Sequence, residues 1–329
     1  MLKICQLLCR VSPKPKFQSF LRKFSEKNTE NVKFAKLNHR AVVQLGGKDT
    51  IEHLQGLVTN DVTLLPSSKC MYAMMLNTQG RIDHNLILHW NDGEVLIDCD
   101  ESRADIFMKL LKRYKLRKKV EILERNDLNI WQSWNESCSN VMPDVKHHVC
   151  ANPDPRVKLM GWRVVSCDQP CDDVMMTSSK DYHIWRYKVG VPETDIDLPP
   201  GKSLPLESNL DFMHGINFHK GCYLGQELTA RTHHTGVVRK RLIPVEILEG
   251  KVPEPGTSLR SENNKSAGRL RGVVGGKHGL ALIKLDYEGQ ILTTSGGTKL
   301  KGQRPLWWHN EGRSYSDGAC QPSNINVKT

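Results

Sequence analysis

The 329-residue sequence predicts an α+β protein with a small C-terminal β domain. Two observations predict this class. In the first part of the chain, apolar residues alternate in some stretches and recur at helical spacing in others, in the order strand, helix, strands, helix, strand. Beyond Gly236, short β-type stretches follow one another with Gly-rich turns between them, a pattern typical of a small barrel or sandwich.

Glycines, turn residues and helix caps bound the expected elements of the first part. Asp49 or Thr50 caps the first helix, and Asn91-Asp92-Gly93 has the turn chemistry of a hairpin. The pattern weakens from about residue 126 to 155, and the Pro-rich stretch 191–207 is expected to cross between subdomains. The expected strands are 41–45, 70–77, 82–90, 94–100, 119–123 and 161–166, and the expected helices are 50–57, 101–114 and 181–188.

The N-terminal segment differs from the rest in charge. Residues 1–25 hold six basic residues and no acid, so they carry more than half of the net charge of +11. Such a leader, with interspersed apolar and Ser residues, is typical of a mitochondrial presequence; a secretory signal and a disordered basic tail are the alternatives. We therefore expect a presequence at 1–25, an α+β region at 36–235 that splits near residue 126, a barrel domain at 236–308 and a disordered tail at 309–329.

A second basic stretch runs from Lys109 to Lys119. Its apolar neighbours, among them Phe107, Leu111 and Tyr114, recur at helical spacing, which places the cations on a solvated helix face. Because no nucleic-acid-binding motif accompanies them, we expect no nucleic-acid partner. We also expect no membrane span, since no run of about 18 apolar residues occurs.

Ten cysteines are spread along the chain without a Cys-x-x-Cys pair. That spacing argues against a zinc ribbon and against a disulfide framework. Scattered free thiols are typical of a reducing compartment such as the mitochondrial matrix or the cytosol.

The stretch HKGCYLGQELTAR, from His219 to Arg231, holds the densest chemistry of the chain. Gly221 and Gly225 allow another group to approach the backbone closely. If a helix begins near Gly225, Cys222 lies just before its positive end and Lys220 adds a second cation. Both would favour the thiolate, which is nucleophilic and binds soft metals. The alternative is a small buried residue in a Gly-rich turn.

A metal site is a second interpretation of this region. Imidazole and thiolate together could bind zinc or iron. No recognised ligand spacing is met, so we expect no permanent metal site. The candidate ligands fall within 21 residues and are His214, His219, Cys222, His233 and His234.

At this motif the chain resembles the YgfZ-type proteins, the iron–sulfur cluster maturation relatives of the glycine-cleavage T-protein, and in particular the mitochondrial branch of that group. The resemblance rests on KGCYLGQE together with the upstream LPLESNLDFMHGINFHKGC and the downstream LTAR. It extends from about residue 36 to 308. Further agreeing segments are LQGLVTNDV (54–62), LNTQGRI (76–82), YKLRKKVEI (114–122) and DPRVKLMGWR (154–163).

The resemblance implies a three-part, cup-shaped fold with a tetrahydrofolate-type pocket in the middle and a small C-terminal β-barrel. The Cys222 loop would line the opening of that pocket. Glu207 matches the position of the T-protein's pterin-binding glutamate, and a carboxylate can accept paired hydrogen bonds from a pterin amino group and ring nitrogen. The other residues assigned to this binding site are Gly221, Tyr223, Gly225, Gln226, Glu227, Arg231 and Asn85.

One segment departs from the T-protein pattern. His84 and Asn85 align with its pair of Asp residues, and Asn85 cannot take a proton as a carboxylate does. Aminomethyl transfer would therefore lack its general base. Asp83 is one step away, and on a regular strand one step faces the other side.

The resemblance thus implies a protein of the mitochondrial matrix that helps to mature 4Fe–4S enzymes such as aconitase and lipoate synthase, late in cluster assembly, with an A-type scaffold partner. We expect Cys222 to act as a transient cluster or metal ligand or as a redox-active thiol. Lys220 would tune it electrostatically, and hydrogen bonds from the Gln226, Glu227 and Arg231 side chains would hold the loop. The implied cofactors are tetrahydrofolate and a transient iron–sulfur cluster.

Two alternatives stay open at this point. One is a folate-dependent aminomethyl transferase, for which the missing Asp pair is the discriminating feature. The other is a non-catalytic folate sensor or scaffold, in which Cys222 is structural.

Overall fold

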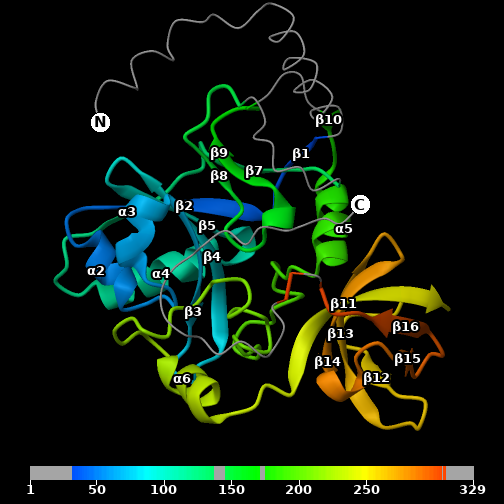
Figure 1. The fold of residues 1–329 in the computed structure, drawn as a ribbon. Helices are drawn as coiled ribbons and strands as arrows, with labels where there is room; N and C mark the ends of the chain where they lie inside the picture. Colours follow the sequence, from blue (N-terminus) through cyan, green and yellow to red (C-terminus); the bar gives the residue numbers. More distant parts are fainter. Residues whose placement is uncertain (1–31, 137–144, 171–174, 306, 309–329) are drawn as a thin grey trace, which may run out of the picture.

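The computed structural model describes residues 32–136, 145–170, 175–305 and 307–308. These residues form two five-stranded sheets that share a core, with a closed six-stranded barrel beside them (Figure 1). The expected presequence and the expected C-terminal tail fall outside the described residues. Within the described ranges, no helix is long and apolar enough to cross a membrane.

The first sheet has the strand order β3-β4-β5-β2-β6, and all neighbouring strands are antiparallel. Both of its faces are covered. On β3, Tyr72 and Met74 join the core shared with the second sheet, whereas Met71 and Met75 face the helices. This explains the unbroken apolar sequence CMYAMML. The strands are β2 (Arg40–Gly46), β3 (Cys70–Leu76), β4 (Ile82–Asn91), β5 (Glu94–Asp100) and β6 (Glu121–Glu124), and the helices are α2 (Thr50–Gln55), η1 (Val62–Leu64), α3 (Leu65–Ser68), η2 (Glu101–Arg103) and α4 (Ala104–Lys115).

The second sheet has the order β10-β1-β7-β9-β8. Its first strand in the chain, β1, precedes the whole of the first sheet and pairs with β7 antiparallel and with β10 parallel. From residue 32 on, the chain therefore forms a strand of the second sheet, then the whole of the first sheet, and then the rest of the second. The strands are β1 (Lys33–Lys36), β7 (Asn129–Trp134), β8 (Cys150–Pro153), β9 (Trp162–Ser166) and β10 (Met175–Met176), and the helices are η3 (Lys158–Met160), between β8 and β9, and α5 (Ser179–Val189).

The C-terminal strands close into a barrel, which confirms the barrel expectation over the sandwich. Ile243, Val245 and Leu300 fill its interior, whereas Leu242 points into the core that the two sheets share. Helix α5 contacts β11, β13 and β14 and so joins the barrel to the sheets. The elements are α6 (Gln226–Thr235), β11 (Lys240–Glu249), β12 (Ser258–Arg260), β13 (Ser266–Val274), β14 (His278–Lys284), η4 (Leu285–Tyr287), β15 (Ile291–Thr294) and β16 (Lys299–Gly302).

The sequence analysis found the strands of the first sheet, helices α2 and α4, strand β9 and helix α5, but it missed η1, α3 and four strands of the second sheet. The missed strands are β1, β7, β8 and β10. The long connection between α5 and α6 is built from turns, in keeping with its prolines. Helix α6 lies at the bottom of the molecule in Figure 1, below β3 and next to the barrel.

Candidate functional site

Cys222 is exposed, in the irregular segment just before α6. Of the five cysteines in the described residues, only Cys167 shares this exposure. Burial raises the pKa of Cys99 to about 12 and that of Cys150 to about 11, which keeps both as thiols at neutral pH. Burial also raises the pKa of Cys70 well above its usual value. Among the cysteines that the structure describes, Cys222 is therefore one of two that are exposed to a partner.

Lys220 anchors the backbone on which Cys222 stands. Its ammonium donates hydrogen bonds to three backbone carbonyl oxygens, those of Gln55 at 2.8 Å, Val58 at 2.7 Å and Asn60 at 2.7 Å. The ammonium also lies 5.1 Å from the centre of the Tyr223 ring. Burial lowers the pKa of Lys220 to about 8, so the charged form still dominates at pH 7. All three ammonium hydrogens have acceptors, and the side chain fastens the loop to the segment after α2.

Further hydrogen bonds join the same two segments. The Leu224 amide donates to the Gly56 oxygen at 3.0 Å, and the Asn217 amide donates to the Thr59 oxygen at 3.1 Å. The Thr59 hydroxyl donates to the Gly215 oxygen at 2.6 Å. The structure thus brings together two stretches that the sequence analysis singled out separately, LQGLVTNDV and HKGCYLGQE. Cys222 lies in the second of these stretches, which the hydrogen bonds join to the first.

The two glycines of the motif differ in their surroundings. Gly225 has φ +75°, and a Cβ there would lie 2.2 Å from the Asn77 carbonyl oxygen. Only glycine fits such a contact, which packs the start of α6 against the turn between β3 and β4. A Cβ on Gly221 would meet nothing within 4 Å. Gly221 is therefore not required for packing in this structure.

The polar residues after the cysteine have few contacts. The Gln226 side-chain oxygen accepts from the Tyr223 amide at 3.3 Å, and burial raises the pKa of Tyr223 to about 12. No ion pair joins Glu227 and Arg231 within the described ranges. Both line a cavity of about 370 Å³ together with Thr78, Gln79, Gly80, Gly225 and Leu228. Of the three side chains predicted to hold the loop, only that of Gln226 forms a hydrogen bond to the loop within the described part of the chain.

The histidines of this region do not gather around Cys222. His233 stacks on Phe218 with ring centres 3.6 Å apart, and His234 meets His233 edge-on. Across the described residues, no group of three His, Cys, Asp or Glu side chains is arranged to hold a metal ion.

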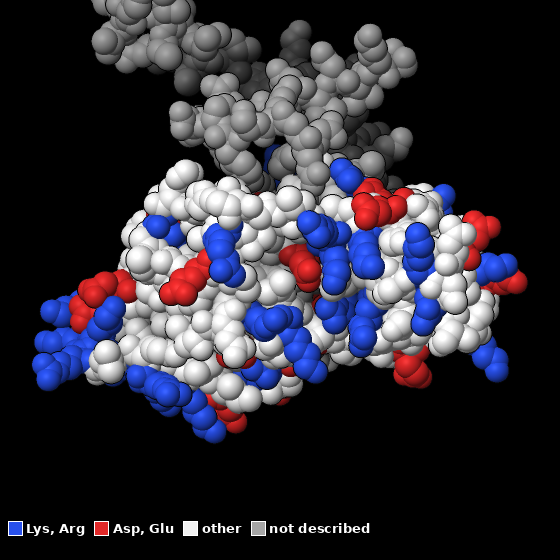
Figure 2. Space-filling model, turned by 90° about the horizontal axis from the view of Figure 1, so that it is seen from below, with Lys and Arg blue, Asp and Glu red and all other residues white. Residues whose placement is uncertain are grey.

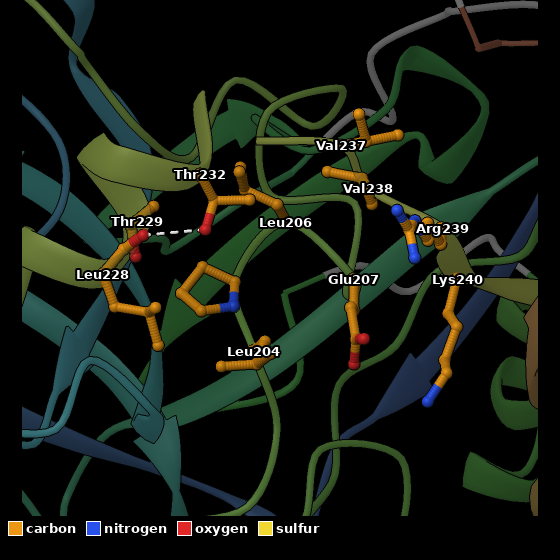
Figure 3. A pocket seen from close by; sticks show the side chains of 11 residues that line it. Leu204, Leu206, Glu207, Leu228, Thr229, Thr232, Val237, Val238, Arg239 and Lys240 are labelled. Atoms are coloured by element: carbon orange, nitrogen blue, oxygen red, sulfur yellow. Dashed lines mark hydrogen bonds between the residues drawn. The ribbon is translucent and has the colours of Figure 1, made fainter. Parts of the chain in front are cut away.

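Glu207 lies in a second cavity of about 330 Å³ between α6, the start of β11 and the turn before Glu207 (Figure 3). The walls are mainly apolar, and Figure 3 shows the Glu207 and Lys240 side chains directed to the same side. Burial raises the pKa of Glu207, and the charges of Lys240, Arg271 and Arg81 oppose the rise. Cys222 lines neither of these two cavities. The remaining lining residues are Leu204, Pro205, Leu206, Leu228, Thr229, Thr232, Val237, Val238 and Arg239.

Basic side chains lie in the Glu207 cavity and near its carboxylate. Arg239 and Lys240 line it directly, and Arg271 and Arg81 act on the Glu207 charge from nearby. Figure 2 shows Lys and Arg side chains gathered on this face of the molecule. An anionic ligand with an apolar portion matches this combination of walls and charges.

Asn85 lies apart from the Cys222 loop and from the two cavities. Its side-chain nitrogen donates to the Glu193 carbonyl oxygen at 2.8 Å, and its side-chain oxygen is buried without a partner. The expectation for Asp83 is wrong. Because β4 is bulged at this residue, the Asp83 carboxylate comes within 3.9 Å of the His84 ring instead of facing away, and it pairs with Arg103 at 2.8 Å.

The sequence analysis missed a buried network of charges between the two sheets. Asp98 of β5 accepts from Arg40 of β2 at 2.6 Å and from Arg163 of β9 at 2.7 Å. Burial alone would raise the pKa of Asp98, but Arg163 and Arg40 hold it below the usual value. Glu193 accepts from Arg156 at 2.6 Å, and its pKa is likewise held well below the usual value against the effect of burial. Fully buried cations are rare, so this cluster fixes how the sheets pack.

Comparison with known sequences gives two similar proteins and one matching family. The chain is 37% identical over 304 residues to "Iron-sulfur cluster assembly factor IBA57, mitochondrial" of Mus musculus, covering 83% of this chain and 84% of that protein. It is 36% identical over 303 residues to the human protein of the same name, with the same coverage. Residues 239–310 match the family described as the CAF17 C-terminal beta-barrel domain.

A solved structure shares the fold. The crystal structure of glycine cleavage system aminomethyltransferase T from Bartonella henselae superposes with a TM-score of 0.68 at 12% identity, covering 84% of this chain and 86% of that one. This confirms the expected α+β fold of the T-protein type with its C-terminal barrel. At that identity the likeness concerns the fold alone.

Proposed function

This chain belongs to the IBA57 family of mitochondrial iron–sulfur cluster assembly factors, and from that premise we propose that it acts in the mitochondrial matrix at a late step of 4Fe–4S protein maturation. Its partner in this step is an A-type scaffold protein. Its clients are 4Fe–4S enzymes of the aconitase and lipoate synthase type. The cluster is cargo that passes through the complex.

The observation that carries this proposal is the exposed Cys222 on a firmly held backbone. Iron in such clusters is bound by cysteine sulfur, which gives up its proton on binding. The hydrogen bonds of Lys220 and Thr59 fix the loop without covering the sulfur. A sulfur on a fixed and open loop can serve as one ligand of a cluster whose other ligands come from the partner. We propose transient ligation as the role of Cys222.

The test replaces Cys222 in cells that lack the protein. Cys222→Ala is expected to leave folding intact and to abolish support of lipoate synthesis and aconitase activity. Cys167→Ala is the matched control, because Cys167 is the other exposed cysteine, and it should support both activities normally. Purified protein is also expected to form a complex with the A-type scaffold only when a cluster is reconstituted. Normal rescue by a folded Cys222→Ala protein would remove the thiol from the mechanism.

We also propose that the Glu207 cavity binds a reduced folate. A carboxylate among apolar walls suits the paired donors of a pterin, and the cations of Arg239 and Lys240 suit the carboxylates of a folate tail. When bound, tetrahydrofolate would supply one-carbon chemistry. The residues of this chain would bind and orient it. None of the other residues assigned to the folate site lines the Glu207 cavity, and three of them, Gly225, Glu227 and Arg231, line the neighbouring cavity instead.

Calorimetric titration with tetrahydrofolate tests the folate proposal separately. Glu207→Gln keeps the shape and removes the charge, and it is expected to weaken binding by about tenfold or more. Glu249→Gln, in an exposed ion pair with Lys299 on the barrel, is the control and should leave the affinity unchanged. Binding that is absent, or equal in both variants, contradicts this part of the proposal and leaves the role of Cys222 untouched.

The rival function is a folate-dependent aminomethyl transferase. It needs a group that takes a proton, and the amide of Asn85 is already committed to the Glu193 carbonyl. We therefore rank the assembly role first. Sustained turnover of an aminomethyl donor with tetrahydrofolate by the purified protein would reverse that ranking.

A further inference from the structure

One strongly charged surface plays no part in the proposed function. Between Asp105 and Glu121 the chain carries seven Lys and Arg residues and no acid. The apolar side of α4 is buried against the first sheet, which displays the cations outward. Figure 2 shows a group of Lys and Arg side chains at the left edge of the molecule, the side on which α2 and α4 lie in Figure 1. The seven residues, called the α4 tip below, are Lys109, Lys112, Arg113, Lys115, Arg117, Lys118 and Lys119.

Few acidic groups neutralise the α4 tip. Glu52 pairs with Lys118 at 3.0 Å, and it is the one carboxylate among the described residues that forms an ion pair with a tip side chain. The Asp49 carboxylate accepts from the Lys119 backbone amide at 2.6 Å. Most of the positive charge of the tip is therefore free to attract an anionic surface.

An apolar side chain projects from the middle of these cations. Leu116, which ends α4, is 87% exposed, more than any other large apolar side chain in the described ranges. Its φ is +50° and its ψ is −115°, a backbone conformation that favours glycine and strains leucine. Exposure and strain both oppose a leucine here. Packing within the protein offers no reason for it.

We propose that the α4 tip is a docking surface for membranes that contain anionic phospholipids. Cations beside an exposed apolar residue match a bilayer surface. The lipid phosphates attract the cations, and the apolar residue inserts into the interface between headgroups and acyl chains. A nucleic-acid backbone would use the cations and gain nothing from Leu116. Ile106, in the first turn of α4, is also 45% exposed. The surface holds the protein on a membrane peripherally, with no segment crossing it.

Flotation of the full chain with vesicles tests the proposal. Binding is expected to vesicles of phosphatidylcholine with cardiolipin, to be absent with phosphatidylcholine alone, and to weaken as salt is added. K112E/R113E is expected to lower the partition coefficient about a hundredfold, since each cation near such a surface matters. Leu116→Ser should lower it several-fold, roughly as expected for one lost apolar side chain, and leave the salt dependence unchanged.

K251E/K265E supplies the matched control, because it makes the same change of charge at exposed barrel positions. It should bind nearly as well as the unaltered chain. Thermal unfolding of each variant verifies that it is folded. An equal loss in the control would mean that net charge alone drives binding and overturns the proposal. So would the absence of binding by the unaltered chain, or tighter binding of duplex RNA through the same residues.

Discussion

Replacing Lys220 by methionine tests its role as a loop anchor. Methionine keeps most of the aliphatic stem and removes the ammonium. Three carbonyl oxygens, those of Gln55, Val58 and Asn60, then lose their donor. Hydrogen bonds to a charged group contribute about 1.5 to 3 kcal/mol each when buried.

The expected loss is smaller than the sum of three such bonds. Lys220 is only part-buried, so water can replace some of the lost donors. The burial of the ammonium, which lowers the pKa of Lys220 to about 8, is also relieved in the variant. We expect the free energy of unfolding to fall by about 2 to 4 kcal/mol.

Urea unfolding measures this loss, and amide hydrogen exchange locates it. Exchange should accelerate in residues 55–61 and 217–224, the two segments that Lys220 joins. Lys180→Met, at an exposed position on α5, is the control and should change the free energy by less than about 0.5 kcal/mol. A Lys220→Met protein as stable as this control, with unchanged exchange in both segments, would refute the anchoring role.

Three further predictions concern stability. Gly225→Ala should lower the free energy of unfolding by more than about 2 kcal/mol because its Cβ meets a carbonyl, whereas Gly221→Ala should be nearly neutral; chemical denaturation compares them. In the same assay, Glu193→Gln should lower the free energy of unfolding by about 3 to 5 kcal/mol because it breaks a buried ion pair with Arg156. Glu249→Gln, which breaks an exposed pair, should lower it by less than about 1 kcal/mol. Burial raises the pKa of Asp195 from 3.8 to about 6, so ionisation opposes folding above pH 6 and not below pH 3.8. Since the Asp195 side chain is partly exposed, Asp195→Asn should raise the free energy of unfolding by only about 1 kcal/mol at pH 7 and should not change it near pH 4. Equal effects at both pH values would contradict this prediction.

Local patterns predicted the first sheet well and the second poorly. Strands β3, β4 and β5 consist of apolar residues between clear turns, so periodicity located them. Strand β7 is equally buried but contains Gln132 and Ser133. Gln132 is buried because Arg163 and the Met160 carbonyl satisfy its amide, and both partners lie about 30 positions away. A single sequence does not show such pairing.

The candidate site shows the same division. The motif around Cys222 predicted the start of α6 and marked the exposed cysteine, because glycine and cap patterns are local. The contacts of Lys220 could not be predicted, since its acceptors are backbone carbonyls up to 165 positions earlier in the chain. The position of Asp83 was mispredicted for a related reason. A bulge depends on the register with the neighbouring strand β3.

The charge network between the sheets has a consequence for how this molecule can be divided. Arg40 and Asp98 belong to the first sheet, and Arg163 to the second. A fragment that ends after β6 would leave Arg40 and Asp98 without Arg163. It would also lack β7 and β10, the two strands that pair with β1. Either half expressed alone is therefore expected to be insoluble or unfolded. Recombination between relatives should succeed at the barrel boundary and fail between the sheets.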